Sequence, residues 1–185
     1  MKQRTLLLTR AALLCAIIVV STLWLKFSIP GTDVMVTTQV FFVLLCGFLL
    51  PPQYCLLCLG TYLLLGLIGL PVFSATVGPA VLSTPSFGYL LAFPFAAAGV
   101  SCLQKKWRKN KFGPLWASFC GVAISYAIAL PYIAILKAAY LQAPVPLVTL
   151  LSAYCLAFLP LDIVKAFLAA LLGTRLQKAL KINRD

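Results

Sequence analysis

Six long apolar runs, separated by segments of 3 to 23 residues, dominate the pattern of residues along this chain. They cover residues 6–25, 37–50, 54–70, 89–103, 115–136 and 160–178. A helix of about 20 apolar residues crosses the hydrocarbon core of a bilayer and satisfies its own backbone hydrogen bonds there. The pattern therefore predicts an all-α integral membrane protein with six transmembrane helices, folded as a single membrane domain over residues 1–185.

A long interruption lies at residues 71–88, between the third and fourth predicted helices. It contains three prolines and two glycines together with five serines or threonines, so a continuous helix is not expected there. Non-helical backbone is tolerated at membrane depth only against protein or a cavity. The segment is interpreted either as a re-entrant or lid-like wall of a pocket or as a plain external loop, and the sequence leaves both open.

Basic residues at the ends of the predicted helices indicate how the chain is oriented. The segment 105–111 carries five bases in seven positions, and further bases stand before the first helix and after the last one. Lys26 and Lys137 fall on the opposite side. Because the cytoplasmic loops of membrane proteins are enriched in lysine and arginine, both termini are predicted to be cytoplasmic.

Composition agrees with this prediction and excludes several classes of function. Hydrophobic residues make up 63% of the chain and charged residues 10%, with a mean hydropathy of +1.05, which lies outside the soluble range. The net charge of +12 comes from bases that flank apolar runs, which argues against nucleic-acid binding. Histidine is absent, and the Cys55–Cys58 pair has no second pair beside it, so no metal and no cofactor is expected.

One acid and one base interrupt the last apolar run. Asp162 and Lys165 are three residues apart, so a helix places them on one face. Charged residues inside an apolar run are costly unless paired and commonly line a site, although an ion pair that only joins two helices fits the sequence too. In the predicted orientation this pair, the polar residues Thr37 and Gln39, and the 71–88 segment all fall toward the outer face.

The missing motifs limit the possible chemistry. The chain has no GxxxxGK[ST] phosphate-binding loop, so it is not expected to hydrolyse ATP itself. The chain has no histidine and only three carboxylates, so the usual catalytic bases are missing. Lys165 is the one base inside the apolar run that could activate a serine, and an enzyme is therefore not predicted. Ligand capture needs only a pocket with a few polar groups, whereas a gradient-driven secondary carrier of a small organic anion remains an alternative.

Four short motifs carry a resemblance to a known family. Residues 158–165, FLPLDIVK, are similar to a family pattern F-L-P-G-D-x-x-K, and residues 69–73, GLPVF, are similar to G-L-P-V-F. Residues 36–42 resemble V-T-L-Q-x-F-F, and residues 85–89 resemble P-T-G-G-Y. By these motifs the chain resembles the BioY family, the biotin-specific S components of energy-coupling factor (ECF) transporters, over nearly its whole length, with Leu161 where the family usually has glycine.

The resemblance implies biotin uptake through a pocket open to the outside. Carried over to the matching positions, Asp162 and Lys165 would hydrogen-bond the polar groups of biotin. Thr37, Gln39 and Tyr89 are implied as further substrate-binding residues.

The resemblance also implies partners and a location. An ECF membrane-embedded coupling subunit and paired cytoplasmic ATPases would supply the energy, and Ala12 and Ala16 would form the small-residue face that docks the coupling subunit. The chain would be a multi-pass protein of a bacterial-type cell membrane. An S component for another small vitamin remains an alternative to biotin.

Overall fold

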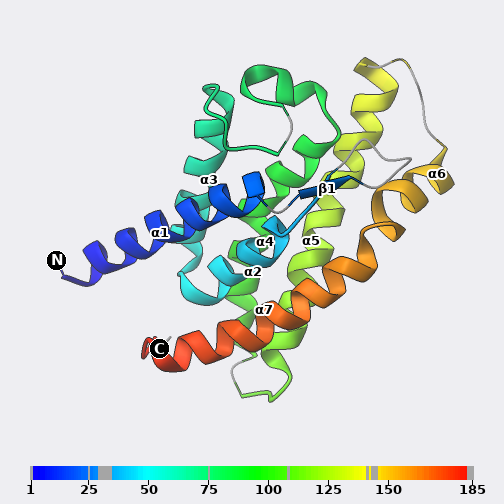
Figure 1. The fold of residues 1–185 in the computed structure, drawn as a ribbon. Coiled ribbons are helices and arrows are strands. Elements are labelled where there is room, and N and C mark those ends of the chain that lie inside the picture. Colours follow the sequence, from blue (N-terminus) through cyan, green and yellow to red (C-terminus); the bar gives the residue numbers. More distant parts are fainter. Residues whose placement is uncertain are drawn as a thin grey trace.

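The chain folds into a bundle of helices, which the computed structural model describes for residues 2–24, 26–28, 35–74, 76–107, 109–140, 142 and 146–182. The α-helices are α1 (Lys2–Trp24), α2 (Gln39–Leu49), α3 (Pro52–Leu67), α4 (Ser86–Lys106), α5 (Gly113–Ile135), α6 (Leu147–Leu151) and α7 (Leu159–Ala179). Figure 1 shows that the start of α1 and the end of α7 lie on the same side of the molecule.

Among the described residues, four helical segments are long and apolar enough to cross a membrane. They are Gln3–Trp24, Ser86–Lys106, Gly113–Tyr140 and Leu147–Ala179. The last two include single π-helical turns, η2 (Leu136–Tyr140) and η3 (Ser152–Leu156), which extend α5 and join α6 to α7. An integral membrane fold is thus confirmed from the length and composition of these helices.

The helices α2 and α3 are also apolar but have only 11 and 16 residues. At 1.5 Å per residue, α2 is roughly 16 Å long, about half the thickness of a hydrocarbon core. Every residue of α2 from Val43 to Leu49 is buried, so other helices rather than lipid surround it. A short helix is tolerated here because it lies inside the bundle.

A small antiparallel ribbon precedes α2. The strands β1 (Lys26–Ser28) and β2 (Met35–Thr37) pair with Lys26 opposite Thr37. The predicted start of the second helix at residue 37 is wrong by two residues, because Thr37 ends β2 and α2 begins at Gln39. The predicted all-α fold class did not include this ribbon; it holds for the rest of the described chain.

The prolines of the 71–88 segment predict that it is not a continuous α-helix, and the described part of the segment confirms this. In its described part a 3₁₀ turn, η1 (Gly78–Ser83), lies between extended residues, and α4 begins at Ser86. Gly69 and Gly78 have φ angles of 106° and 71°, which side chains other than glycine rarely adopt. These two glycines allow the chain to turn at the end of α3 and again at the start of η1.

Small residues let α2 pack closely against α4 and α7. A Cβ atom at Gly173 of α7 would overlap the ring of Phe48, and one at Gly47 of α2 would overlap Val100 of α4. The Gln177 side-chain amide of α7 donates a hydrogen bond of 2.6 Å to the Phe48 carbonyl. These contacts fix α7 against α2, the two helices whose first turns carry polar residues described below.

We expect Gly173→Leu to lower the free energy of unfolding by about 2 kcal/mol, because the new side chain must displace the fully buried Phe48 ring. Thermal unfolding in detergent measures the change. Gly60→Leu is the matched control, since a Cβ at Gly60 of α3 meets no atom within 4 Å. Equal melting temperatures for the two variants would contradict the close packing of α2 on α7.

Candidate functional site

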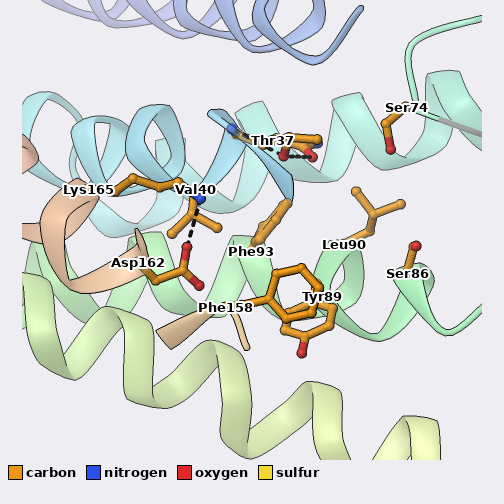
Figure 2. A pocket seen from close by; sticks show the side chains of 11 residues that line it. Thr37, Val40, Ser74, Ser86, Tyr89, Leu90, Phe93, Phe158, Asp162 and Lys165 are labelled. Carbon is orange, nitrogen blue, oxygen red and sulfur yellow. Dashed lines mark hydrogen bonds and ion pairs between the residues drawn. The ribbon is translucent and has the colours of Figure 1, made fainter. Parts of the chain in front are cut away.

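All five predicted substrate-binding residues line one pocket. Its walls come from the end of β2 and the start of α2, from the segment after α3, and from the first turns of α4 and α7. The lining residues are Thr37, Gln39, Val40, Ser74, Ser86, Tyr89, Leu90, Phe93, Phe158, Asp162 and Lys165. Figure 2 shows the charged pair at one end of the pocket, Ser74 and Ser86 at the other, and Phe93 and Leu90 between them.

Asp162 and Lys165 form an ion pair on one face of α7. The distance from Lys165 Nζ to Asp162 Oδ1 is 2.8 Å, and the side chains are 16% and 8% exposed, respectively. Asp162 lies in the first turn of the helix, where the dipole favours a carboxylate. The prediction that three-residue spacing puts both groups on one face of one helix is therefore confirmed.

A third group completes this charged end of the pocket. The Tyr126 hydroxyl of α5 donates a hydrogen bond of 2.7 Å to Asp162 Oδ2, so each carboxylate oxygen has a donor. Tyr126 is buried and its ring meets that of Tyr89 edge-on at 5.8 Å. Sequence reasoning missed Tyr126, because a tyrosine in an apolar run has no local pattern that reveals a partner on another helix.

Tyr89 is held in place from the opposite side. Its hydroxyl donates a hydrogen bond to the Tyr154 carbonyl, in the π turn η3 just before α7. The ring therefore stands between Tyr126 on α5 and the segment that leads into Asp162. This arrangement leaves the ring, rather than the hydroxyl, as the group that Tyr89 offers to the pocket.

Thr37 and Gln39 belong to a second hydrogen-bond network. The Gln39 Nε2 group donates a bond of 2.5 Å to the Tyr62 hydroxyl, which in turn donates a bond of 3.0 Å to the Val72 carbonyl. The Thr37 hydroxyl donates to Gln39 Oε1 at 3.3 Å. The network ties the end of β2 to α3 and to the segment after it, and it orients the buried Gln39 amide.

The cavity within this pocket is small. Its volume of about 50 Å³ is enough for a few water molecules, whereas small-molecule sites usually measure about 300 Å³ or more. Aromatic side chains, those of Tyr89, Phe93 and Phe158, occupy much of the space between the polar ends. A ligand of vitamin size would have to move these rings or the segment that carries Ser74.

The chemistry of the pocket suits recognition of a neutral polar group. A carboxylate accepts N–H donors and an ammonium donates to a carbonyl, and both lie in an apolar surround that strengthens such bonds. Within the described ranges, no group of three histidine, cysteine or acidic side chains is placed to hold a metal ion. The geometry therefore supports binding of a small molecule.

The other residues singled out by sequence lie away from the pocket. Ala12 and Ala16 are both exposed on α1. Leu161 stands where the family that the motifs resemble usually has glycine. Its side chain is 46% exposed and does not line the pocket. This replacement therefore leaves the charged end of the pocket intact. Ala75, in the 71–88 segment, lies outside the described residues.

Comparison with known proteins gives consistent matches over most of the chain. The model of the BioY family matches residues 1–182. A protein of Thermotoga maritima named biotin transporter BioY is 36% identical over 183 residues, covering 96% of this chain and 98% of that protein. A protein of the same name from Lactococcus lactis subsp. cremoris is 30% identical over 181 residues, covering 95% of this chain and 93% of its own length.

A solved structure shares the fold. The crystal structure of the S component for biotin from an ECF-type ABC transporter superposes with a TM-score of 0.75 at 28% sequence identity. The superposition covers 96% of this chain and 93% of that one.

Proposed function

The chain belongs to the BioY family, and we propose that it is the biotin-binding S component of an ECF-type transporter. It captures biotin at the outer face of the cell membrane and delivers the vitamin across it when a partner complex hydrolyses ATP. The observation that carries this proposal is the Asp162–Lys165 pair, with a buried carboxylate and a partly buried ammonium, at the end of an otherwise largely apolar pocket. The names of the matched relatives and of the matched S component support biotin as the ligand.

The charged end of the pocket fits the ureido ring of biotin. The ring offers N–H donors to the Asp162 carboxylate and a carbonyl acceptor to the Lys165 ammonium. A carboxylate has about four acceptor positions, so Asp162 can take an N–H while Tyr126 keeps its bond. Tyr126 acts as a positioning residue, because it orients the carboxylate without lining the pocket.

The rest of the ligand would extend toward the opposite end. The apolar side chains of Leu90 and Phe93 suit the thioether ring and the alkyl chain, and the hydroxyls of Ser74 and Ser86 suit the terminal carboxylate. Because the cavity is small, the ligand must be admitted by a movement of the wall. The segment around Ser74 is the element we assign as the lid, since it is non-helical and joins α3 to α4.

The proposed topology has six membrane crossings. The two shorter apolar helices, α2 and α3, complete the four long ones, and α2 crosses within the bundle rather than in contact with lipid. The basic 105–111 loop and both ends of the chain lie in the cytoplasm in this arrangement. The pocket then opens to the outside, which is the side from which a vitamin is captured.

Energy for transport comes from partners in this proposal. The coupling subunit in the membrane docks on the face of α1 that carries Ala12 and Ala16, and paired cytoplasmic ATPases drive the cycle. Both alanines are exposed, so a partner helix can approach the α1 backbone closely.

The first test is calorimetric titration of the detergent-purified protein with biotin, desthiobiotin and thiamine. We expect tight binding of biotin and no heat with thiamine, because thiamine lacks the paired N–H and carbonyl groups of the ureido ring. Heat with thiamine but not with biotin would assign the chain to a different vitamin. If none of the three binds, the family fold would remain but the assignment of biotin as the ligand would be wrong.

We expect Asp162→Ala to weaken biotin binding by about 3 kcal/mol, or roughly 100-fold, because it removes an acceptor and leaves the Lys165 charge without its partner. The same titration measures the loss, and circular dichroism checks that the helices remain. Wild-type affinity in this variant would exclude the assigned site.

Two tyrosines of α5 provide a matched comparison for this site. Tyr126→Phe removes a bond to the Asp162 carboxylate and should weaken biotin binding by about 1 kcal/mol. Tyr132→Phe removes a similar bond, to the Leu82 carbonyl in η1 rather than to the Asp162 carboxylate, and should weaken binding less than Tyr126→Phe does. An equal effect of both substitutions would indicate general loss of stability instead of positioning.

The docking face is tested by copurification with the coupling subunit. Replacing both Ala12 and Ala16 by leucine should reduce the recovered complex at least about tenfold, since larger side chains keep the partner backbone away. Ala123 and Ala127 form an exposed pair of the same spacing on α5, and leucine at both positions is the control. If only the Ala123 and Ala127 variant loses the complex, the partner docks on α5 and not on α1.

A further inference from the structure

A large cleft opens at the end of the bundle opposite to the pocket lined by Asp162 and Lys165, which we call the vitamin pocket. It measures about 790 Å³ and lies between the first turns of α1, the turn joining α2 to α3, and the ends of α4 and α7. Figure 1 shows that the first turns of α1 project beyond the other helices. They lie on the side of the molecule where α7 ends. We call this space the basic cleft.

The basic cleft combines a cationic rim with apolar walls. Four of its lining residues are cations, namely Arg10, Lys105, Lys106 and Lys181, and none of its described lining residues is acidic. The walls are leucine, isoleucine and proline side chains such as Leu6, Leu7, Leu49 and Ile182. A space with this composition suits a ligand that has an anionic head and an apolar body.

Arg10 is the unusual member of this set. It lies two turns into α1 between Thr9 and Ala11, is half-buried, and has no ion-pair or hydrogen-bond partner among the described residues. A guanidinium at this depth is costly unless it meets an anion or water at the interface. Its planar fork of donors matches the oxygens of a phosphate group.

A second cleft adjoins the first one and contains a further unused donor. It measures about 920 Å³ and shares Lys105, Lys181 and Ile182 with the basic cleft. Gln104, which is 8% exposed, lines it, and its side-chain Nε2 has no acceptor among the described residues, although its Oε1 accepts a bond of 2.8 Å from Gln177. An unused amide donor beside several cations is again a group that an anion would satisfy.

We propose that the basic cleft binds an anionic phospholipid, with its phosphate at Arg10 and Lys181 and an acyl chain against Leu6 and Leu7. Basic pockets between membrane helices on the cytoplasmic side are suited to such head groups. A lipid fits better than a soluble anion because the walls below the cations are apolar and belong to membrane-crossing helices. The bound lipid fills the space between α1 and α7 and supports the position of α1.

The test is native mass spectrometry of the purified chain mixed with equal amounts of phosphatidylglycerol and phosphatidylcholine. We expect the wild-type protein to retain phosphatidylglycerol preferentially. The double variant Arg10→Gln/Lys181→Gln should lose this preference on the order of tenfold. Thermal unfolding by circular dichroism checks each variant's fold without use of biotin, so the outcome does not depend on the vitamin pocket.

A charge-matched double variant separates a site from general attraction. Arg4→Gln/Arg175→Gln removes one cation from α1 and one from α7, at exposed positions that do not line the cleft. It should keep the wild-type preference. Equal loss in both double variants, or no loss in the cleft variant, would overturn the proposal.

Two further arms distinguish other occupants. Inorganic phosphate added in excess should not displace phosphatidylglycerol, and displacement would indicate a soluble-anion site instead. The cleft variant could also keep its lipid but fail to copurify with the coupling subunit. That result would identify the cleft as a protein-docking site and overturn the lipid assignment.

Discussion

A carboxylate inside an apolar helix bundle has to be hydrogen-bonded, and the site depends on how this requirement is met. Asp162 receives one donor from its own helix, Lys165, and one from α5, Tyr126. The carboxylate therefore joins α5 to α7 at the pocket and is oriented before a ligand arrives. Because the surroundings are of low dielectric, these bonds are strong, and an incomplete set would be costly.

The packing of the short helix α2 holds the other wall of the pocket. Glycine at position 173 admits the Phe48 ring between α2 and α7, and Gly47 brings α2 against α4. Because α2 is enclosed, its first residue, Gln39, can turn its amide inward to the Tyr62 hydroxyl rather than to water. The buried helix and the buried amide are thus consequences of the same close packing.

The two ends of the molecule differ in chemistry. The pocket lined by Asp162 and Lys165 has one acid and one base that satisfy each other within an apolar surround. The opposite end has many bases and no acidic residue in its described clefts, a distribution that would attract anions of the membrane surface. An S component with this distribution would bind a neutral ring on one side and lipid head groups on the other.

The sequence by itself determined the membrane class, the approximate positions of the helices and the Asp162–Lys165 pair, because apolar runs and three-residue spacing are local properties. It also indicated Thr37, Gln39 and Tyr89, through motifs that resemble a family. Only the tertiary structure decided that Tyr126 completes the carboxylate site, that α2 is enclosed, and that Arg10 lies over a cleft. Those features depend on contacts between helices distant in the chain, which no local pattern encodes.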